Sequence, residues 1–167
     1  MKKNLVLCTL LSCLNSFAQN NNEKSMRDSF TFSMPVGKDS FYVSHISASP
    51  FIVGPKILQI FPGETVFIEV EQSNGVITVI SSVKENKNPE KTLEISFLQN
   101  LKNNVHSHMM LKVKNPFKQD LSYEAMVHLV KGKWISTSIM PVKAGIWGYE
   151  MWPDIITSIA LSEWKFL

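Results

Sequence analysis

The chain has almost no cysteine, because Cys8 and Cys13 are its only two and both lie near the start. A product that has lost its first eighteen residues would have no thiol for a disulfide, a thiolate metal site or nucleophilic catalysis. Such a protein must be stabilised by side-chain packing and hydrogen bonding alone.

Motifs of common enzymes are also missing. The sequence contains neither the G-x-S-x-G turn nor the H-E-x-x-H pair, and it has no glycine-rich phosphate-binding loop. Glu69, Glu94 and Glu124 fall at positions where strand alternation directs them outward, which is typical of solvated carboxylates and not of an acid–base pair. The sequence therefore predicts a protein that is not an enzyme.

A concentration of basic charge is absent as well. The chain has 17 lysine and arginine residues against 14 acidic residues, and the basic ones are scattered. Lys2 and Lys3 belong to the N-terminal segment, so the remaining charges nearly cancel. Nucleic acid is excluded as a partner on this ground, since its binding requires a basic patch or stripe.

The N-terminus has the pattern of a secretory signal peptide. Two lysines precede the apolar residues 5–14, and small residues follow at Ser16 and Ala18. The apolar stretch is too short to cross a bilayer, which needs about 20 residues. We expect residues 1–18 to be removed, no transmembrane segment, and a periplasmic or secreted protein.

The same segment allows an alternative. Residues 10–13, Leu-Leu-Ser-Cys, resemble a bacterial lipobox, in which Cys13 would carry a lipid anchor. That interpretation leaves an apolar stretch of only about seven residues, at the bottom of the usual range for a leader. Cleavage after Ala18 is the preferred interpretation.

Composition divides the rest of the chain into two parts. Residues 19–29 are polar and lack periodic apolar positions, which predicts a flexible spacer. Residues 30–167 have a length that is usual for one domain, and they contain no convincing helix.

Short apolar runs in this domain alternate with polar residues and are broken by Pro, Gly or Asn about every ten residues, the pattern of β-strands. The clearest is a hairpin of residues 65–71 and 76–83, joined by Asn74-Gly75. Further strands are predicted at residues 93–97, 106–113, 121–129, 134–142 and 155–166, the last with an irregularity near Ser162. Strands at this spacing without helices between them favour an antiparallel sandwich. We predict an all-β fold, an immunoglobulin-like antiparallel β-sandwich of about eight to ten strands.

Two short motifs carry a resemblance. A predicted strand ends in Asn115-Pro116, and Glu-Met-Trp-Pro at residues 150–153 precedes the final strand. In these features the C-terminal third resembles uncharacterised bacterial exported immunoglobulin-like β-sandwich proteins. The resemblance implies the sandwich fold and no particular activity.

Histidine and methionine supply one candidate site. His106, His108 and Met110 share a face of one predicted strand, and Met126 and His128 share the corresponding face of the next. Imidazole and thioether ligands together suit copper. If the two strands pair as a hairpin, facing Cβ atoms lie about 5 Å apart and the five side chains would bind the ion. If the connection crosses between sheets, the residues are ordinary surface positions and no site forms.

Aromatic residues supply the second candidate. Trp147, Tyr149, Met151 and Trp152 crowd a segment broken by glycine and proline, which predicts a loop. Exposed rings there would stack on a sugar or anchor a protein partner. Alternatively, Trp147 or Trp152 folds back as a plug over an open end of the sandwich.

The sequence therefore predicts an exported non-enzymatic binding or structural module of the bacterial envelope. It supplies strand edges and an aromatic segment, both suited to a protein partner, and no catalytic set. No cofactor is expected. The alternatives are a periplasmic copper-binding protein that uses the His/Met surface and a carbohydrate-binding module that uses the aromatic loop.

Overall fold

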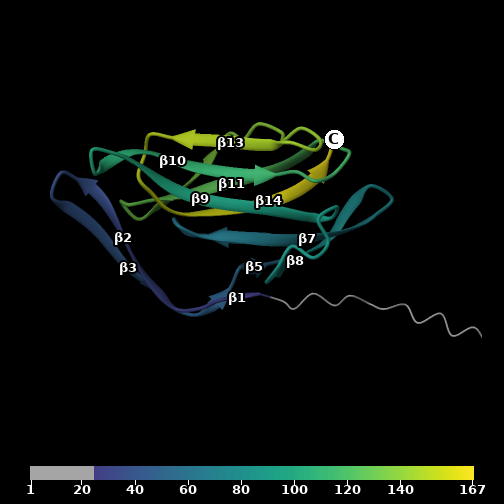
Figure 1. Ribbon diagram of the computed structural model, residues 1–167, viewed down its shortest axis with the longest axis horizontal. Coiled ribbons are helices and arrows are strands. Elements are labelled where there is room, and N and C mark those ends of the chain that lie inside the picture. Colours follow the sequence, from purple (N-terminus) through teal and green to yellow (C-terminus); the bar gives the residue numbers. More distant parts are fainter. Residues whose placement is uncertain (1–24) are drawn as a thin grey trace, which may run out of the picture.

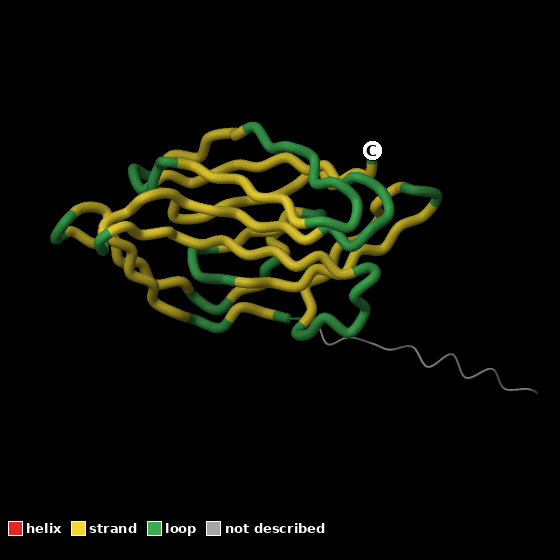
Figure 2. The backbone as a smooth tube through the Cα atoms, turned by 45° about the horizontal axis from the view of Figure 1, so that its top comes forward, coloured by secondary structure: helices red, strands yellow, loops and turns green. Residues whose placement is uncertain are grey.

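The computed structural model describes residues 25–167, and these form two packed antiparallel β-sheets (Figures 1 and 2). The expected β-sandwich is confirmed. The predicted signal peptide, Cys13 and residues 19–24 of the predicted spacer lie outside the described residues. Within residues 25–167, no helix is long and apolar enough to cross a membrane.

The first sheet has the strand order β13-β10-β9-β7-β8, and Figure 1 shows β13 at its edge. Its strands are β7 (Thr65–Ser73), β8 (Val76–Val83), β9 (Thr92–Lys102), β10 (Val105–Lys114) and β13 (Trp147–Trp152).

The second sheet has the strand order β12-β11-β14-β6-β5. Its strands are β5 (Ile52–Gly54), β6 (Ile57–Ile60), β11 (Leu121–Leu129), β12 (Lys133–Thr137) and β14 (Ile156–Phe166). The predicted strand at residues 134–142 is therefore shorter than expected, and its last residues belong to a loop.

Alternating side chains form the core between the sheets. In β7, Val66, Ile68 and Val70 are buried, and in β11 the buried set includes Tyr123 and Val127. Both sets are the faces that the alternation predicts. Burial raises the pKa of Tyr123 well above its usual value, so its phenol stays neutral in the core.

Two local expectations are also confirmed. Asn74 and Gly75 both have positive φ, 50° and 77°, as a two-residue hairpin turn between β7 and β8 requires. The pairing of β11 with β14 shifts register just after Ser162, where Glu163 has a φ of 51°. This bulge is the irregularity expected near Ser162.

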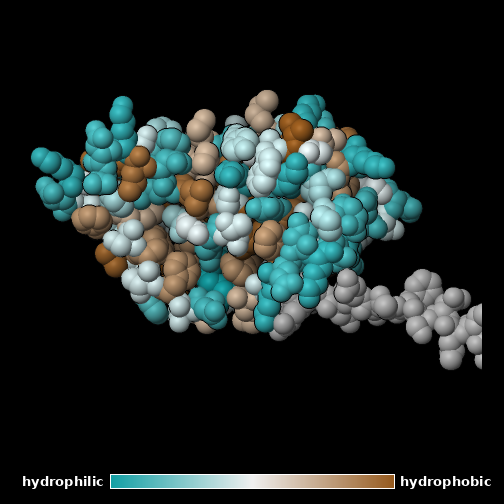
Figure 3. Space-filling view, viewed as in Figure 1, coloured by the Kyte–Doolittle hydropathy of each residue, from teal (hydrophilic) through white to brown (hydrophobic). Residues whose placement is uncertain are grey.

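A separate hairpin of β2 (Phe30–Gly37) and β3 (Ser40–Ile46) lies against the two sheets. Its inner face buries Phe32 and Met34 in the common core. Its outer face exposes Phe41 and Val43, and Figure 3 shows apolar side chains gathered over this hairpin.

Ordered structure begins before the predicted boundary at Phe30. Strand β1 (Met26–Arg27) pairs with β4 (Ser49–Pro50), and the side chain of Arg27 is buried. Residues 25–29 therefore belong to the domain and not to a spacer. The polar composition of this segment suggested exposure to solvent, but its arginine, Arg27, is buried and forms an ion pair inside the protein.

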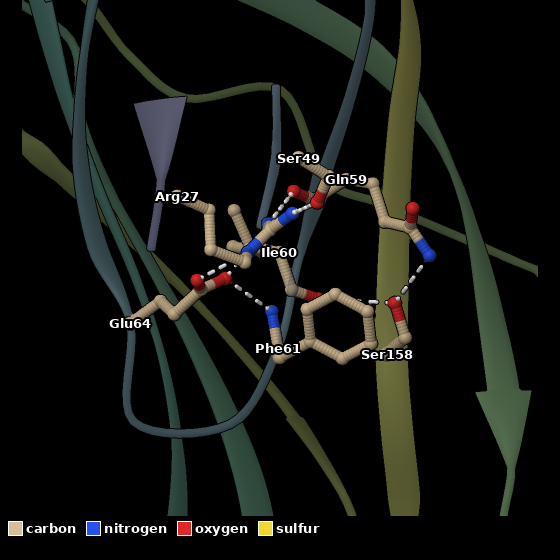
Figure 4. A network of polar contacts seen from close by, with 7 residues as sticks. All are labelled: Arg27, Ser49, Gln59, Ile60, Phe61, Glu64 and Ser158. Atoms are coloured by element: carbon tan, nitrogen blue, oxygen red, sulfur yellow. Dashed lines mark hydrogen bonds and ion pairs between the residues drawn. The ribbon is translucent and has the colours of Figure 1, made fainter. Parts of the chain in front are cut away.

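The guanidinium of Arg27 is bound on several sides (Figure 4). It forms a bidentate pair with Glu64, with a second bond of 3.0 Å from Nη2 to Oε2. Nη2 also donates to the carbonyl of Gln59 at 2.7 Å, and Nη1 donates to Ser49 Oγ at 3.0 Å. The charged group lies 4.6 Å and 4.8 Å from the centres of two phenylalanine rings, those of Phe51 and Phe61.

Candidate functional site

The predicted copper ligands lie on different sheets. Strand β10 pairs with β9 and β13, whereas β11 pairs with β12 and β14. Of the two connections that the sequence leaves open, a hairpin and a crossing between sheets, the structure has the crossing. The connection crosses from one sheet to the other, so the outer faces that carry Met110 and Met126 belong to opposite sides of the sandwich.

The crossing is held by Asn115, which is fully buried. Its Nδ2 donates to the carbonyls of Gln119 and Val142 at 2.9 Å and to that of Lys143 at 3.2 Å. Its Oδ1 accepts the backbone N–H of Phe117 at 3.0 Å. These bonds hold the segment between β10 and β11 in the conformation that carries the chain from the first sheet to the second.

His106 and His108 do not share a face either. The register of β10 on β9 shifts between them, which turns His106 toward the interior side of the sheet. There its ring bonds Gln99 Nε2 at 3.0 Å and the carbonyl of Pro153 at 2.9 Å. His108 keeps the outward position and contacts Ser107 Oγ at 3.1 Å.

On the second sheet, His128 points outward as predicted and Met126 is exposed. The His128 ring bonds Thr157 Oγ1 at 2.7 Å and lies 5.0 Å from the ring of Trp134. Across residues 25–167, no group of three or more His, Cys, Asp or Glu side chains could hold a metal ion. The five residues do not assemble into one site.

The aromatic segment is an edge strand and not a loop. Residues 147–152 form β13, which pairs antiparallel with β10 from Lys114↔Trp147 to Met109↔Trp152. Gly148 allows close packing here, since a Cβ atom at this position would lie 2.6 Å from Cγ2 of Val142. Gly148 is therefore required by close packing against Val142 and does not mark a loop.

Alternation in β13 separates its aromatic residues. Trp152 points inward, with its ring 6.5 Å from that of Phe97 and its Nε1 donating to Thr137 Oγ1 at 2.8 Å. That hydrogen bond joins β13 to β12 across the side of the sandwich. Trp147, Tyr149 and Met151 point outward, and the last two are 54% and 62% exposed.

Two lysines of β10 lie over these outward rings. The Nζ atom of Lys112 is 5.0 Å from the Trp147 ring centre and 6.0 Å from that of Tyr149. Lys114 lies 6.0 Å from Trp147 and donates to the carbonyl of Gly145 at 2.7 Å. The outer face at this edge thus combines aromatic surface with positive charge.

The register also shows which backbone groups of β13 are open. Asn115 donates to the carbonyl of Ile146, and hydrogen-bonded pairs in an antiparallel ladder recur at every second position. Gly148, Glu150 and Trp152 therefore bond to β10, and the backbone groups of Trp147, Tyr149 and Met151 point away from it. We define the β13 edge as these three residues.

Within the two five-stranded sheets of the described part of the chain, the other edge strands are shorter than β13 or partly covered. Strand β5 has three residues. On β8, the carbonyl of Ile77 accepts from Lys56 Nζ and the carbonyl of Ser82 accepts from Ser25 N. Natural proteins protect edges with charges, proline or covering segments, and the three outward side chains of the β13 edge carry no charge.

Sequence reasoning named the residues of this edge but missed the lysines over them. A signal was available, because Lys112 lies on the outward face of the strand predicted at residues 106–113, and Lys114 directly follows that strand in the same alternation. What was missing was the pairing of β10 with a segment 33 or more residues later in the chain. The chain matches no family model, no curated protein and no solved structure.

Proposed function

We propose that the protein is an exported, non-enzymatic binding module of the bacterial envelope that captures an extended segment of another protein at the β13 edge. The single observation that carries this proposal is the open backbone of Trp147, Tyr149 and Met151 beside uncharged side chains, of which those of Tyr149 and Met151 are exposed. An added strand would take main-chain hydrogen bonds from the edge and specificity from alternate side chains.

Export rests on the leader-like residues 1–18, and the absence of catalytic motifs supports a binding role. The lysines over the rings favour a partner strand with an acidic residue near Trp147, because the Nζ atom of Lys112 would be within reach.

A second candidate function is carbohydrate binding at the same face. It is favoured by one observation: Trp147 and Tyr149 are two residues apart on β13, so both side chains lie next to each other on its outer face. Rings placed in this way offer flat apolar surface to a sugar. This function would depend on the rings and not on the backbone edge.

A selection from displayed random peptides separates the two. When the protein without residues 1–18 is used as the bait, we expect the selected peptides to be enriched in sequences whose apolar residues occupy every second position. Tyr149→Pro removes the one N–H of this residue that faces the open edge, so it should weaken peptide binding about tenfold, since one main-chain hydrogen bond and the ring are lost. Proline is tolerated here because that N–H makes no bond to β10.

Tyr149→Ala is the matched control, because it removes the ring and keeps the N–H. If strand addition is correct, the alanine variant should retain more peptide binding than the proline variant. Equal losses in both variants, together with binding to a glycan array that Trp147→Ala abolishes, would support carbohydrate binding. Failure to enrich any peptide would contradict the proposal.

A further inference from the structure

A pocket of about 290 Å³ lies between β3 and the outer side of the second sheet. Tyr42 and Ser44 of β3 form one wall. Gln59 of β6, His128 of β11 and Trp134 of β12 form the other. The volume is near the small end of the range for ligand sites, which is room for about one ring.

The polar groups of the pocket are held in place from behind. Gln59 Nε2 donates to Ser158 Oγ at 3.0 Å, and that hydroxyl donates to the carbonyl of Ile60 at 3.2 Å (Figure 4). His128 is held by Thr157 at 2.7 Å and by its ring contact with Trp134. Such support keeps the side chains ordered before a ligand arrives.

The same bonds fix which atoms stay open to a ligand. The Thr157 hydroxyl donates to the His128 carbonyl at 3.1 Å, so its oxygen accepts from Nδ1 and the ring proton is assigned there. Nε2 then carries a lone pair. Among the described residues, nothing hydrogen-bonds this atom, Oε1 of Gln59, or the hydroxyls of Tyr42 and Ser44.

The lining has no lysine, arginine, aspartate or glutamate. A charged ligand would find no counter-ion in the wall. The open groups are two acceptors and two hydroxyls, so a matching ligand has at least two hydrogen-bond donors together with groups that can also accept. Trp134 is 40% exposed and offers a flat apolar face beside them.

We infer that this pocket binds a neutral sugar ring, with one face on Trp134 and hydroxyls donated to Gln59 Oε1 and His128 Nε2. A pyranose has both an apolar face and several hydroxyls that donate and accept, and it carries no charge. The site is separate from the β13 edge, which belongs to the other sheet.

The inference is tested by titrating the ¹⁵N-labelled protein without residues 1–18 with glucose, galactose, mannose and N-acetylglucosamine. We expect at least one of them to bind saturably with a dissociation constant of about 1 mM, as is usual for a ligand of one ring. Shifted amides should map to β3, β11 and β12.

Variants locate the contact. Trp134→Ala should weaken binding about tenfold, and Tyr42→Phe should weaken it severalfold while leaving the pocket packed. Phe41→Ala, which removes an exposed ring from the outer face of β3 and from outside the pocket lining, is the matched control and should bind as the parent does.

Four results would overturn the inference. They are no saturable binding by any of the four sugars, equal affinity in Trp134→Ala and the parent, glucuronate binding as tightly as glucose, and adenosine binding more tightly than every sugar. Because the readout lies on β3 and the second sheet, away from β13, each of these results leaves the proposal for the β13 edge unaffected.

Discussion

Replacing Glu64 with alanine is expected to lower the free energy of unfolding by about 3–5 kcal/mol, measured by urea denaturation followed by circular dichroism. The change would leave Arg27 buried without its anion, since the side chain of Arg27 is only 3% exposed. It would also remove the acceptor of the Phe61 backbone N–H, which bonds Glu64 Oε2 at 2.8 Å.

Two further variants test the cause. The double variant Arg27→Met with Glu64→Leu should recover much of the loss, because it leaves no buried charge unpaired. Lys143→Ala removes an ion pair at the surface and should change stability far less. In the parent protein, the hydrogen bond from Lys143 holds the pKa of Asp120 below its usual value. A loss for Glu64→Ala as small as that for Lys143→Ala would contradict this account of Arg27.

Asn115→Asp is expected to lower the free energy of unfolding by about 3–5 kcal/mol at neutral pH, although the side chain keeps its size. The amide nitrogen faces three carbonyl oxygens, and a carboxylate oxygen there would replace a donor with an anion. Asn115→Ala removes the same bonds without adding charge and should cost about 1–3 kcal/mol.

The loss in Asn115→Asp should depend on pH with a definite sign. Burial against carbonyls raises the pKa of the new carboxyl in the folded protein above its unfolded value. The variant is therefore most stable while the carboxyl is protonated, and its stability should fall as the pH rises from about 4 to about 7. Urea denaturation at both pH values provides the measurement. A loss that is smaller than that of Asn115→Ala at neutral pH, or that does not change with pH, would contradict the assigned bonds.

The parts of the fold that sequence reasoning predicted are those fixed by local chemistry. Asn74-Gly75 forms its hairpin because both residues accept positive φ, which needs no knowledge of the rest of the chain. The buried faces of β7 and β11 follow from alternation in the same way.

The errors arose where distant parts of the chain decide the outcome. Alternation in β10 and β11 is equally consistent with a hairpin and with a crossing between sheets, and Asn115 decides for the crossing through contacts with residues 142 and 143. One bulge in β10 turned His106 to the opposite face from His108. These two features keep the five candidate copper ligands apart.

The aromatic segment shows a different kind of error. Gly148 was interpreted as a loop signal, whereas it is needed for the close approach of Val142. Trp152 points inward from an edge strand and packs against Phe97, which differs from a loop residue that covers an open end, while Trp147 and Tyr149 remain on the outer face. The composition of the sequence identifies the aromatic segment. Which of its side chains point inward and which point outward follows only from its pairing with β10.

The proposed strand addition requires an open backbone on β13, and residue-resolved amide hydrogen exchange of the free protein tests this directly. The amides of Gly148, Glu150 and Trp152 should exchange slowly because they bond to β10, whereas those of Trp147, Tyr149 and Met151 should exchange at rates typical of exposed amides. Slow exchange at all six positions would show that the edge is already covered and would contradict the proposed binding site.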